Sequence, residues 1–308
     1  IEDVYDEFSY GIHKPEAIRD FLKATAARWT KAPRFVLLMG DATYDARNYT
    51  GKGDLDFVPS KLVDTVYTEC SSDDWLADLN EDGVPEMAVG RLPAMTTAQA
   101  DVMVSKITGY NPSAVQATAL FVADAQGSYP FSFEQENSEI SVLLPPSVTI
   151  KNVNLDTEGL SAARTKLFNE INQGPMIVNY AGHGTIDAWS GAALLTSSDV
   201  NSQLSNGNHL PLFVMMTCLN GYFNDPLKES LAETLIKAQN GGGVAVWASS
   251  GLTVPYGQAL MNRQLYQLLF SSNPPTLGEA VQQAKAATDD RDVQLTWVLF
   301  GDPTMKLR

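Results

Sequence analysis

The sequence predicts an α/β fold in which a mainly parallel sheet is flanked by helices on both faces. Two apolar runs, 176–182 (MIVNYAG) and 212–218 (LFVMMTC), are short and bounded by Gly or Pro, as buried parallel strands are. Segments whose apolar residues recur at helical spacing alternate with such apolar runs along the chain. Repeated strand–helix–strand units favour right-handed crossovers within one sheet.

The first third of the chain predicts a smaller α/β unit. A helix is expected from Pro15, where Ile18, Phe21 and Leu22 share one face, and a strand is expected at 34–40. A second strand at 87–92 and a helix at 97–110 follow. Because the pattern breaks near Asn111, we expect an N-terminal subdomain over residues 1–111 and a catalytic subdomain over residues 112–308.

The second part predicts the main sheet. Strands are expected at 119–124, 148–155, 176–181, 212–218 and 244–249. Apolar stripes predict helices between them, one of them formed by Leu227, Leu231, Leu235 and Ala238. Thr276 and Glu279 have the spacing of a capping box at the start of a later helix.

The two apolar runs end in reactive side chains, His183 and Cys218. Ligands of open α/β sheets bind at the carboxyl ends of the strands. A free thiol is only slightly ionised at neutral pH, so a nearby imidazole is needed to take its proton. Gly184 allows a close approach to the main chain, and the amides of Gly184 and Cys218 are candidates for an oxyanion hole. Each side chain alone also fits a structural role, but together they indicate a nucleophile and its base.

At these residues the sequence resembles a known family. The segments VNYAGHGTIDAW (178–189) and CLNGYF (218–223) resemble the histidine and nucleophile segments of the gingipain-type cysteine peptidases, which have a caspase-like fold. The closing TWVLFGDPTMKLR (296–308) is similar to the end of the family's catalytic domain, and the resemblance covers residues 34 to 308. It implies a cysteine endopeptidase that forms a thioester acyl-enzyme. It also implies a secreted or cell-surface protein of a bacterium.

The family has an acidic residue that steadies the catalytic histidine, and Asp124 stands at the matching position, at the end of ALFVAD. A carboxylate on the far imidazole nitrogen would fix the tautomer. An Asp that opens a turn after a strand is the other interpretation.

The resemblance also suggests where the substrate binds. The expected pocket residues are Asp187, Trp189, Val254 and Tyr256. Well-known members cut after Arg or Lys with an acidic pocket base, and Asp187, Glu134 or Glu136 can supply that charge here. Any of these can equally be a solvated surface group.

An acidic turn suggests a metal. Residues 78–83 match the D-x-N-x-D-G start of a calcium loop, but Val89 replaces its closing Glu. The candidate ligands are Asp73, Asp74, Asp78, Asn80 and Asp82. The family's catalytic domains bind structural calcium, whereas catalysis itself needs no cofactor. A solvated acidic turn is the other interpretation.

Composition narrows the function further. The net charge of −15 argues against nucleic-acid binding, and no apolar run is long enough to span a membrane. The two cysteines do not form a disulfide framework, so we expect Cys70 to be a free thiol if Cys218 is the nucleophile; a Cys70–Cys218 bridge, which would silence the enzyme, is the other interpretation. The chain starts at Ile1 with no signal peptide, as a mature or trimmed form would, and further domains are expected in the full protein.

The expected partners are protein or peptide substrates. Two other functions stay open: a sortase-like transpeptidase that processes secretion signals, and a non-catalytic peptidase-like binding module. A nucleotide-binding protein is excluded by the lack of a G-x-G-x-x-G or P-loop motif.

Overall fold

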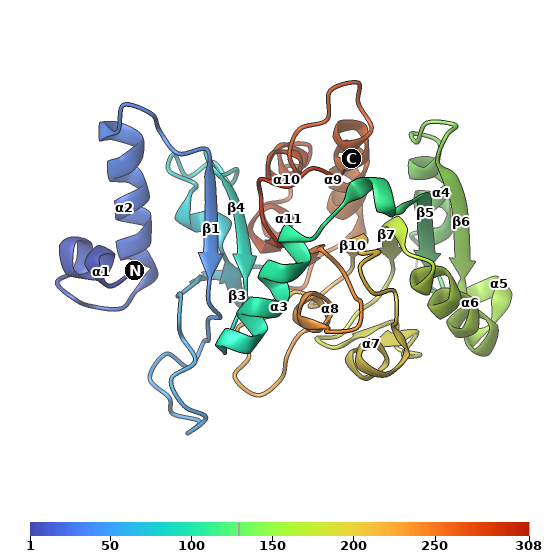
Figure 1. The fold of residues 1–308 in the computed structure, drawn as a ribbon, viewed down its shortest axis with the longest axis horizontal. Helices are drawn as coiled ribbons and strands as arrows, with labels where there is room; N and C mark the ends of the chain where they lie inside the picture. The colour runs from blue at the N-terminus through green and yellow to red at the C-terminus, as the bar shows by residue number, and fades with distance from the viewer. Residues whose placement is uncertain (129, 308) are drawn as a thin grey trace.

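An eight-stranded sheet forms the centre of the protein in a computed structural model that describes residues 1–128 and 130–307 (Figure 1). Its strands follow in the order β1 (Phe35–Met39), β4 (Ala88–Leu92), β12 (Trp297–Phe300), β11 (Ala245–Ser249), β10 (Leu212–Met216), β7 (Pro175–Ala181), β5 (Gln116–Ala123) and β6 (Thr149–Asn154). Neighbouring strands are parallel except β11 and β12. The mainly parallel sheet expected from the sequence is therefore confirmed.

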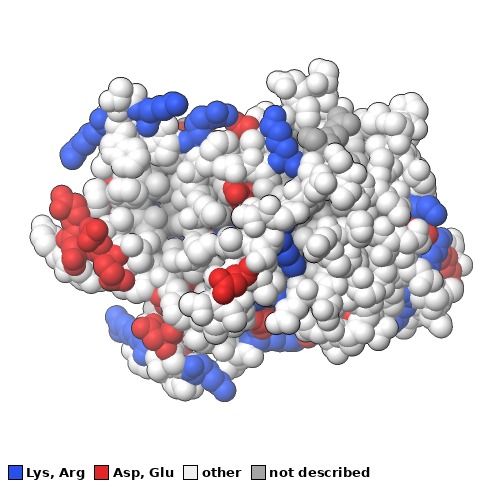
Figure 2. Space-filling view, viewed as in Figure 1, with Lys and Arg blue, Asp and Glu red and all other residues white. Residues whose placement is uncertain are grey.

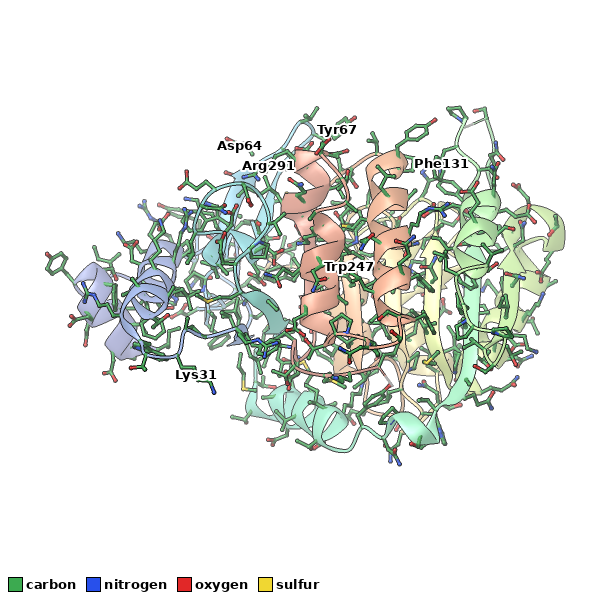
Figure 3. The ribbon with its side chains drawn as sticks, turned by 90° about the horizontal axis from the view of Figure 1, so that it is seen from above. Lys31, Asp64, Tyr67, Phe131, Trp247 and Arg291 are labelled. Carbon is green, nitrogen blue, oxygen red and sulfur yellow. The ribbon has the colours of Figure 1, made fainter. Side chains whose placement is uncertain are left out.

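Helices cover both faces of this sheet. The helices on one face are α3 (Thr97–Thr108), α6 (Leu160–Asn172), α7 (Ser197–Gln203) and α8 (Leu231–Lys237), and those on the other are α4 (Phe133–Ser141), α9 (Pro255–Leu269) and α10 (Leu277–Lys285). Along β7, Val178 packs into the first layer and Ile177 into the second. Figure 3 shows α9 and α10 side by side above Trp247 of β11. Burial on both faces explains why central strands such as β7 and β10 are apolar without alternation.

The N-terminal elements make a third core. Helices α1 (Glu2–Ser9) and α2 (Pro15–Arg28) and a 3-10 turn at Asp74–Leu76 pack with one face of β1 and β4, and the hairpin of β2 (Lys61–Asp64) and β3 (Glu69–Ser72) belongs to the same part of the chain. Their apolar cluster includes Tyr5, Ile18 and Val89. The last strand, β12, lies between β4 and β11, so one sheet runs across Asn111. The division into two subdomains at that residue stays a prediction.

The remaining elements are short. They are a 3-10 turn at Pro112–Ala114, α5 (Leu155–Glu158), the pair β8 (Ala188–Trp189) and β9 (Leu195–Thr196), and α11 (Arg291–Thr296).

One predicted helix begins later than expected. Helix α8 starts after Ser230, whose side chain forms a capping box with Glu233. Leu227 lies in the preceding loop and is 61% exposed, so its place in the apolar stripe was wrong. The helix begins there because the Ser230 hydroxyl accepts from the amide of Glu233, which has no partner within the helix. The capping box expected at Thr276 and Glu279 is confirmed.

The charges are unevenly placed on the surface. Figure 2 shows acidic side chains gathered over α1, at the opposite end of the sheet from α4 and α6 in Figure 1. Among the described residues, no helix combines the length and the low polarity that crossing a membrane requires.

Candidate active site

Three neighbouring parallel strands bring the predicted catalytic residues to one edge of the sheet. Ala123 of β5 pairs with Ala181 of β7, and Ala181 pairs with Met216 of β10. Asp124 directly follows the first of these positions, while His183 and Cys218 each follow theirs by two residues. The register of the sheet therefore places all three at the carboxyl ends of adjacent strands, where ligands of such sheets bind.

The loop that carries His183 leaves β7 through a tight glycine turn. The amide of Gly182 donates to the carbonyl of Met216 at 3.2 Å, which ties the turn to β10. A Cβ at Gly182 would collide with Asp124 and with the Tyr180 hydroxyl. That hydroxyl donates to the carbonyl of His183 at 2.6 Å. The main chain at His183 is thus fixed from both sides.

The acidic residue contacts this main chain rather than the ring. Asp124 is buried, and its carboxylate accepts hydrogen bonds from the amides of His183 at 3.0 Å and Ala125 at 2.8 Å. The expected bond to the far imidazole nitrogen is not among the contacts of Asp124 with the described residues. The physical reason is its position: one residue after β5, it faces the turn at Gly182.

The nucleophile candidate lies on a sharp turn after β10. The strand ends at Met216, two residues earlier than expected, so Cys218 leaves the sheet. Leu219 follows with φ of 60°, a left-handed conformation that costs a non-glycine residue energy. The Cys218 thiol is partly buried and donates to the carbonyl of Thr253 at 3.5 Å. Cys70 is buried, and both cysteines are free, as expected.

The electrostatics at Cys218 do not activate it by themselves. Burial raises the pKa of the Cys218 thiol, while its hydrogen bond to Thr253 acts in the opposite direction. A thiol with a raised pKa holds even less thiolate at neutral pH than a free one. Ionisation therefore requires a base that is brought to it, and His183 is the imidazole on the adjacent strand end.

Gly184 and Cys218, whose amides are the predicted oxyanion donors, lie where the two loops meet. A Cβ at Gly184 would lie 2.6 Å from Thr217 Oγ1 and 2.8 Å from the Cys218 carbonyl oxygen, so the two loops touch at this glycine. The amides of Gly184 and Cys218 donate to no acceptor within the described parts of the chain. Their role as oxyanion donors stays a prediction.

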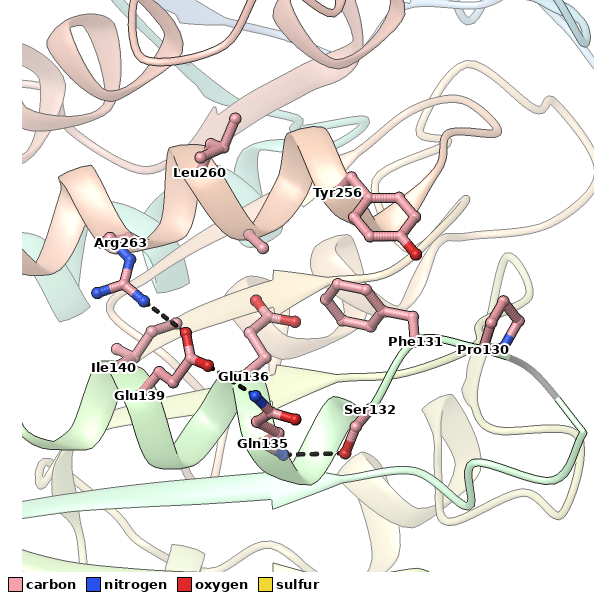
Figure 4. A pocket seen from close by; sticks show the side chains of 11 residues that line it. Pro130, Phe131, Ser132, Gln135, Glu136, Glu139, Ile140, Tyr256, Leu260 and Arg263 are labelled. Atoms are coloured by element: carbon pink, nitrogen blue, oxygen red, sulfur yellow. Dashed lines mark hydrogen bonds and ion pairs between the residues drawn. The ribbon is translucent and has the colours of Figure 1, made fainter.

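A cavity of about 440 Å³ lies between α4 and α9 (Figure 4). Its lining residues are Pro130, Phe131, Ser132, Gln135, Glu136, Glu139, Ile140, Tyr256, Ala259, Leu260 and Arg263. At its mouth the Phe131 and Tyr256 rings meet edge to face at 5.2 Å. Phe131 contacts Phe133, which packs edge to face on the His183 ring at 5.3 Å. This aromatic row connects the cavity to the histidine.

The cavity contains a buried acid. Glu136 is 7% exposed, and burial raises the pKa of its carboxyl to about 7, although a hydrogen bond from Asn262 lowers it. Figure 4 shows Glu136 pointing from α4 toward α9, while Glu139 beside it is paired with Arg263 at 2.6 Å. Arg263 also acts to lower the pKa of Glu136, but among the described residues Glu136 itself forms no ion pair.

The predicted pocket residues do not lie together in one pocket of the structure. Tyr256 lines the cavity, whereas Val254 lines a smaller hollow with Tyr67 and Arg291 beside the β2–β3 hairpin. Asp187 forms an ion pair with Lys228 at 2.7 Å and lies outside the cavity lining. Burial tends to raise the pKa of Asp187, but the hydrogen bond from Lys228 lowers it overall.

The prediction for Trp189 was wrong. Its side chain is fully buried, and its indole stacks on the Tyr180 ring at 4.3 Å with an interplanar angle of 5°. It belongs to the core beneath the histidine loop, together with Phe213. Burying a large aromatic surface there stabilises the loop, which is why the tryptophan points inward.

The five candidate metal ligands do not converge. Asp73 forms a bidentate buried ion pair with Arg91 at 2.6 and 2.7 Å, and Asp74 is paired with Lys285. Asp78, Asn80 and Asp82 accept hydrogen bonds from amides of their own turn. No group of three or more His, Cys, Asp or Glu side chains in the described residues could hold a metal ion. Asp73 and Asp74 do not fit the predicted site because each already neutralises a buried cation.

Three residues of this region were not predicted from the sequence. Phe131 and Phe133 join the cavity to His183, and Asn220 links the two catalytic loops. The aromatic spacing in PFSFEQE and the Asn-Gly pair that begins two residues after Cys218 were the available signals. Neither reveals its role until the loops are placed in space.

Comparisons with known proteins agree with this geometry. The model of peptidase family C25 matches residues 1–308. Gingipain R2 and gingipain R1 of Porphyromonas gingivalis are each 25% identical to this chain over 315 residues, which cover 95% of it but only 40% and 30% of those proteins. The chain thus spans less than half the length of these relatives.

Solved structures share the fold. The crystal structure of the Arg-specific cysteine proteinase gingipain R has a TM-score of 0.82 at 23% identity and covers 98% of this chain and 70% of its own. The complex of the pro- and mature domains of RgpB from P. gingivalis has a TM-score of 0.79 at 22% identity, with 98% and 72% covered. The fold is therefore caspase-like, as expected. The chain belongs to peptidase family C25, the gingipain-type cysteine peptidases.

Proposed function

We propose that this protein is a cysteine endopeptidase in which Cys218 is the nucleophile and His183 the base. The observation that carries this proposal is their register: they stand two residues beyond paired positions of adjacent parallel strands. His183 takes the thiol proton, and Cys218 Sγ attacks the carbonyl carbon of the scissile bond. The amides of Gly184 and Cys218 hold the oxyanion, and His183 returns the proton to the leaving amine.

The thioester formed in this step needs an acceptor. Water resolves it in an endopeptidase, whereas an amine would resolve it in a transpeptidase, and the family resemblance favours water. Adding glycinamide to a cleavage reaction separates the two acceptors. We expect free acid products at every amine concentration, and conversion of most product to the amide adduct would support the transpeptidase instead.

We further propose that the cavity between α4 and α9 accepts a basic side chain before the cut. Phe131 and Tyr256 provide aromatic surfaces for an aliphatic stem or a guanidinium, and the buried Glu136 carboxylate provides the opposite charge. Gingipain R, whose structure resembles this one, is an Arg-specific cysteine proteinase, which supports the same choice. Lys is the other basic residue that this chemistry permits.

Fluorogenic peptides with Arg, Lys, Gln or Leu before the scissile bond test both proposals. Cys218→Ala should abolish all cleavage. Glu136→Gln should lower kcat/KM for Arg peptides about 30- to 100-fold, because a desolvated charge pair loses one partner, and leave the Leu peptide unchanged. Asp187→Asn is the matched control, since Asp187 is already paired with Lys228, and should change both by less than about twofold. An unchanged Arg-to-Leu ratio in Glu136→Gln would refute the basic pocket alone.

Calcium is proposed only for the turn at Asp78, Asn80 and Asp82. Its support is the D-x-N-x-D-G pattern, in which carboxylate and amide oxygens alternate. Isothermal titration with Ca²⁺ should show binding that Asp82→Ala removes, and absence of heat in the native chain would contradict the proposal.

Two wider properties follow from the family resemblance. We propose a secreted or cell-surface location in a bacterium, and additional domains in the full protein. The relatives that this chain matches are more than twice its length, which supports the second proposal.

A further inference from the structure

Asn220 joins the nucleophile turn to the histidine loop. It lies two residues after Cys218, and its side chain is fully buried. Its Nδ2 donates to the carbonyl of Thr185 at 2.6 Å and to that of Ala188 at 3.2 Å. Both carbonyls belong to the loop that begins with His183. One amide group therefore holds the segments of the two catalytic residues together.

The main chain of Asn220 is fixed as well. Its amide donates to the carbonyl of Cys218 at 2.8 Å, and its carbonyl accepts from the amide of Ala232 at 2.9 Å. The neighbouring amide of Leu231 donates to the carbonyl of Ile186 at 2.8 Å. The first amides of a helix have no partner within it, and in α8 they are used to bind both loops. The Asn220 side chain thus starts from a rigid base.

The contact between the loops is close at Gly184. An added Cβ there would lie 2.6 Å from Thr217 Oγ1 and 3.2 Å from Asn220 Nδ2. Each of these two loops carries one of the proposed reacting groups, His183 or Cys218. A side chain that bridges the loops therefore affects the distance between those two groups. The bonds of Asn220 to the carbonyls of Thr185 and Ala188 are side-chain hydrogen bonds that link these two segments.

We propose that Asn220 is a positioning residue that sets the distance between His183 and Cys218. The inference rests on the roles proposed for these two residues above. It predicts an effect on the chemical step, because misplacing a reacting group by about 1 Å can lower a rate by about 100-fold. It predicts little effect on substrate affinity, because the cavity is formed by α4 and α9.

Asn220→Asp is the sharpest test. It keeps the size of the side chain but turns its two N–H donors into a carboxylate oxygen that faces two carbonyl oxygens. We expect kcat to fall about 100-fold and KM to stay within about twofold. We also expect the rate of Cys218 alkylation by iodoacetamide, followed from about pH 5 to pH 9, to shift toward the profile of an unassisted thiol. Asn220→Ala loses the same bonds without adding charge and should lower kcat at least tenfold.

Asn206 provides the matched control. It is buried, and its Nδ2 also donates to two carbonyls, those of His209 and Gly242, both at 2.9 Å. It lies before β10 rather than after it, at the opposite end of that strand. Asn206→Asp should lower the melting temperature and leave kcat and the alkylation profile unchanged.

The outcomes are distinct. A folded Asn220 variant with kcat within about threefold of the native value, or an equal loss of kcat in Asn206→Asp, would overturn the positioning role. If the native protein shows no cleavage that depends on Cys218, the proposed function has failed. The alkylation profile still decides the positioning role in that case, because it needs no substrate.

Discussion

The carboxylate of Asp124 accepts a hydrogen bond from the backbone amide of His183 at 3.0 Å, across two neighbouring strands. Its second oxygen accepts from the amide of Ala125 at 2.8 Å. The acid therefore fixes the main chain from which the imidazole projects. An acidic residue can assist a catalytic histidine by holding its main chain or by fixing the tautomer of its ring. The contact of Asp124 with the His183 amide is of the first kind.

Substitution of Asp124 should reveal which way applies. Asp124→Asn keeps an oxygen that can accept from the His183 amide, so we expect kcat to fall less than about tenfold. Asp124→Ala leaves two amides without an acceptor and should lower the free energy of unfolding by about 1.5–3 kcal/mol. Steady-state kinetics and urea unfolding measure these effects. An acid that fixes the tautomer loses about 10⁴ in kcat on change to Asn, and that result would contradict the main-chain role.

The affinity for a basic substrate should depend on pH through Glu136. Burial raises the pKa of this carboxyl to about 7, so it is neutral below that pH and ionised above it. KM for an Arg peptide should therefore fall as pH rises through about 7. Glu136→Gln should remove this dependence, and a Leu peptide should not show it in either protein. If KM of Glu136→Gln for the Arg peptide depends on pH in the same way as KM of the native protein, the titrating group is not Glu136.

The free energy of unfolding should decrease as pH rises over the same range, whereas the affinity for a basic substrate should increase. The folded-state pKa of Glu136 lies above the usual value of about 4.3, so the folded state holds the proton more tightly than the unfolded chain does. Its contribution to the free energy of unfolding is fully present below about pH 4 and is lost as pH rises through about 7. Urea midpoints of the native protein and Glu136→Gln, compared at several pH values, measure the difference. Parallel curves for the two proteins would exclude this linkage.

The glycine at the contact of the loops should not accept a methyl group. A Cβ at Gly184 would lie 2.6 Å from Thr217 Oγ1 and 2.8 Å from the Cys218 carbonyl oxygen, so we expect Gly184→Ala to cost about 1–3 kcal/mol of stability and to lower kcat. Gly191 lies in the turn between β8 and β9, and a Cβ there meets nothing within 4 Å. Gly191→Ala should therefore leave both quantities unchanged. Equal kcat values in the two variants would show that the separation of the loops does not limit the reaction.

Much of the fold was predictable because its signals are local. The apolar runs of β7 and β10 stand out since a strand buried on both faces needs no polar alternation. A local pattern also led to the wrong prediction for Leu227. The helical spacing of apolar residues includes Leu227, although this residue lies before the start of α8. Trp189 was misassigned for a related reason: an aromatic residue in a loop after the histidine can point into the core or into a pocket, and the sequence does not distinguish them.

The sequence by itself determined the reactive side chains, their place after two buried strands, and the mainly parallel sheet, because strand periodicity and residue chemistry are properties of short segments. The tertiary structure alone decided which acids are available to a ligand. Asp73 and Asp74 are neutralised by Arg91 and Lys285, whereas Glu136 is buried beside a cavity whose Arg263 is paired with Glu139. It also decided that Asp124 holds the main chain of His183 and that Asn220 joins the two loops. These contacts connect residues far apart in the chain, and their partners follow only from the order and register of the strands in the sheet.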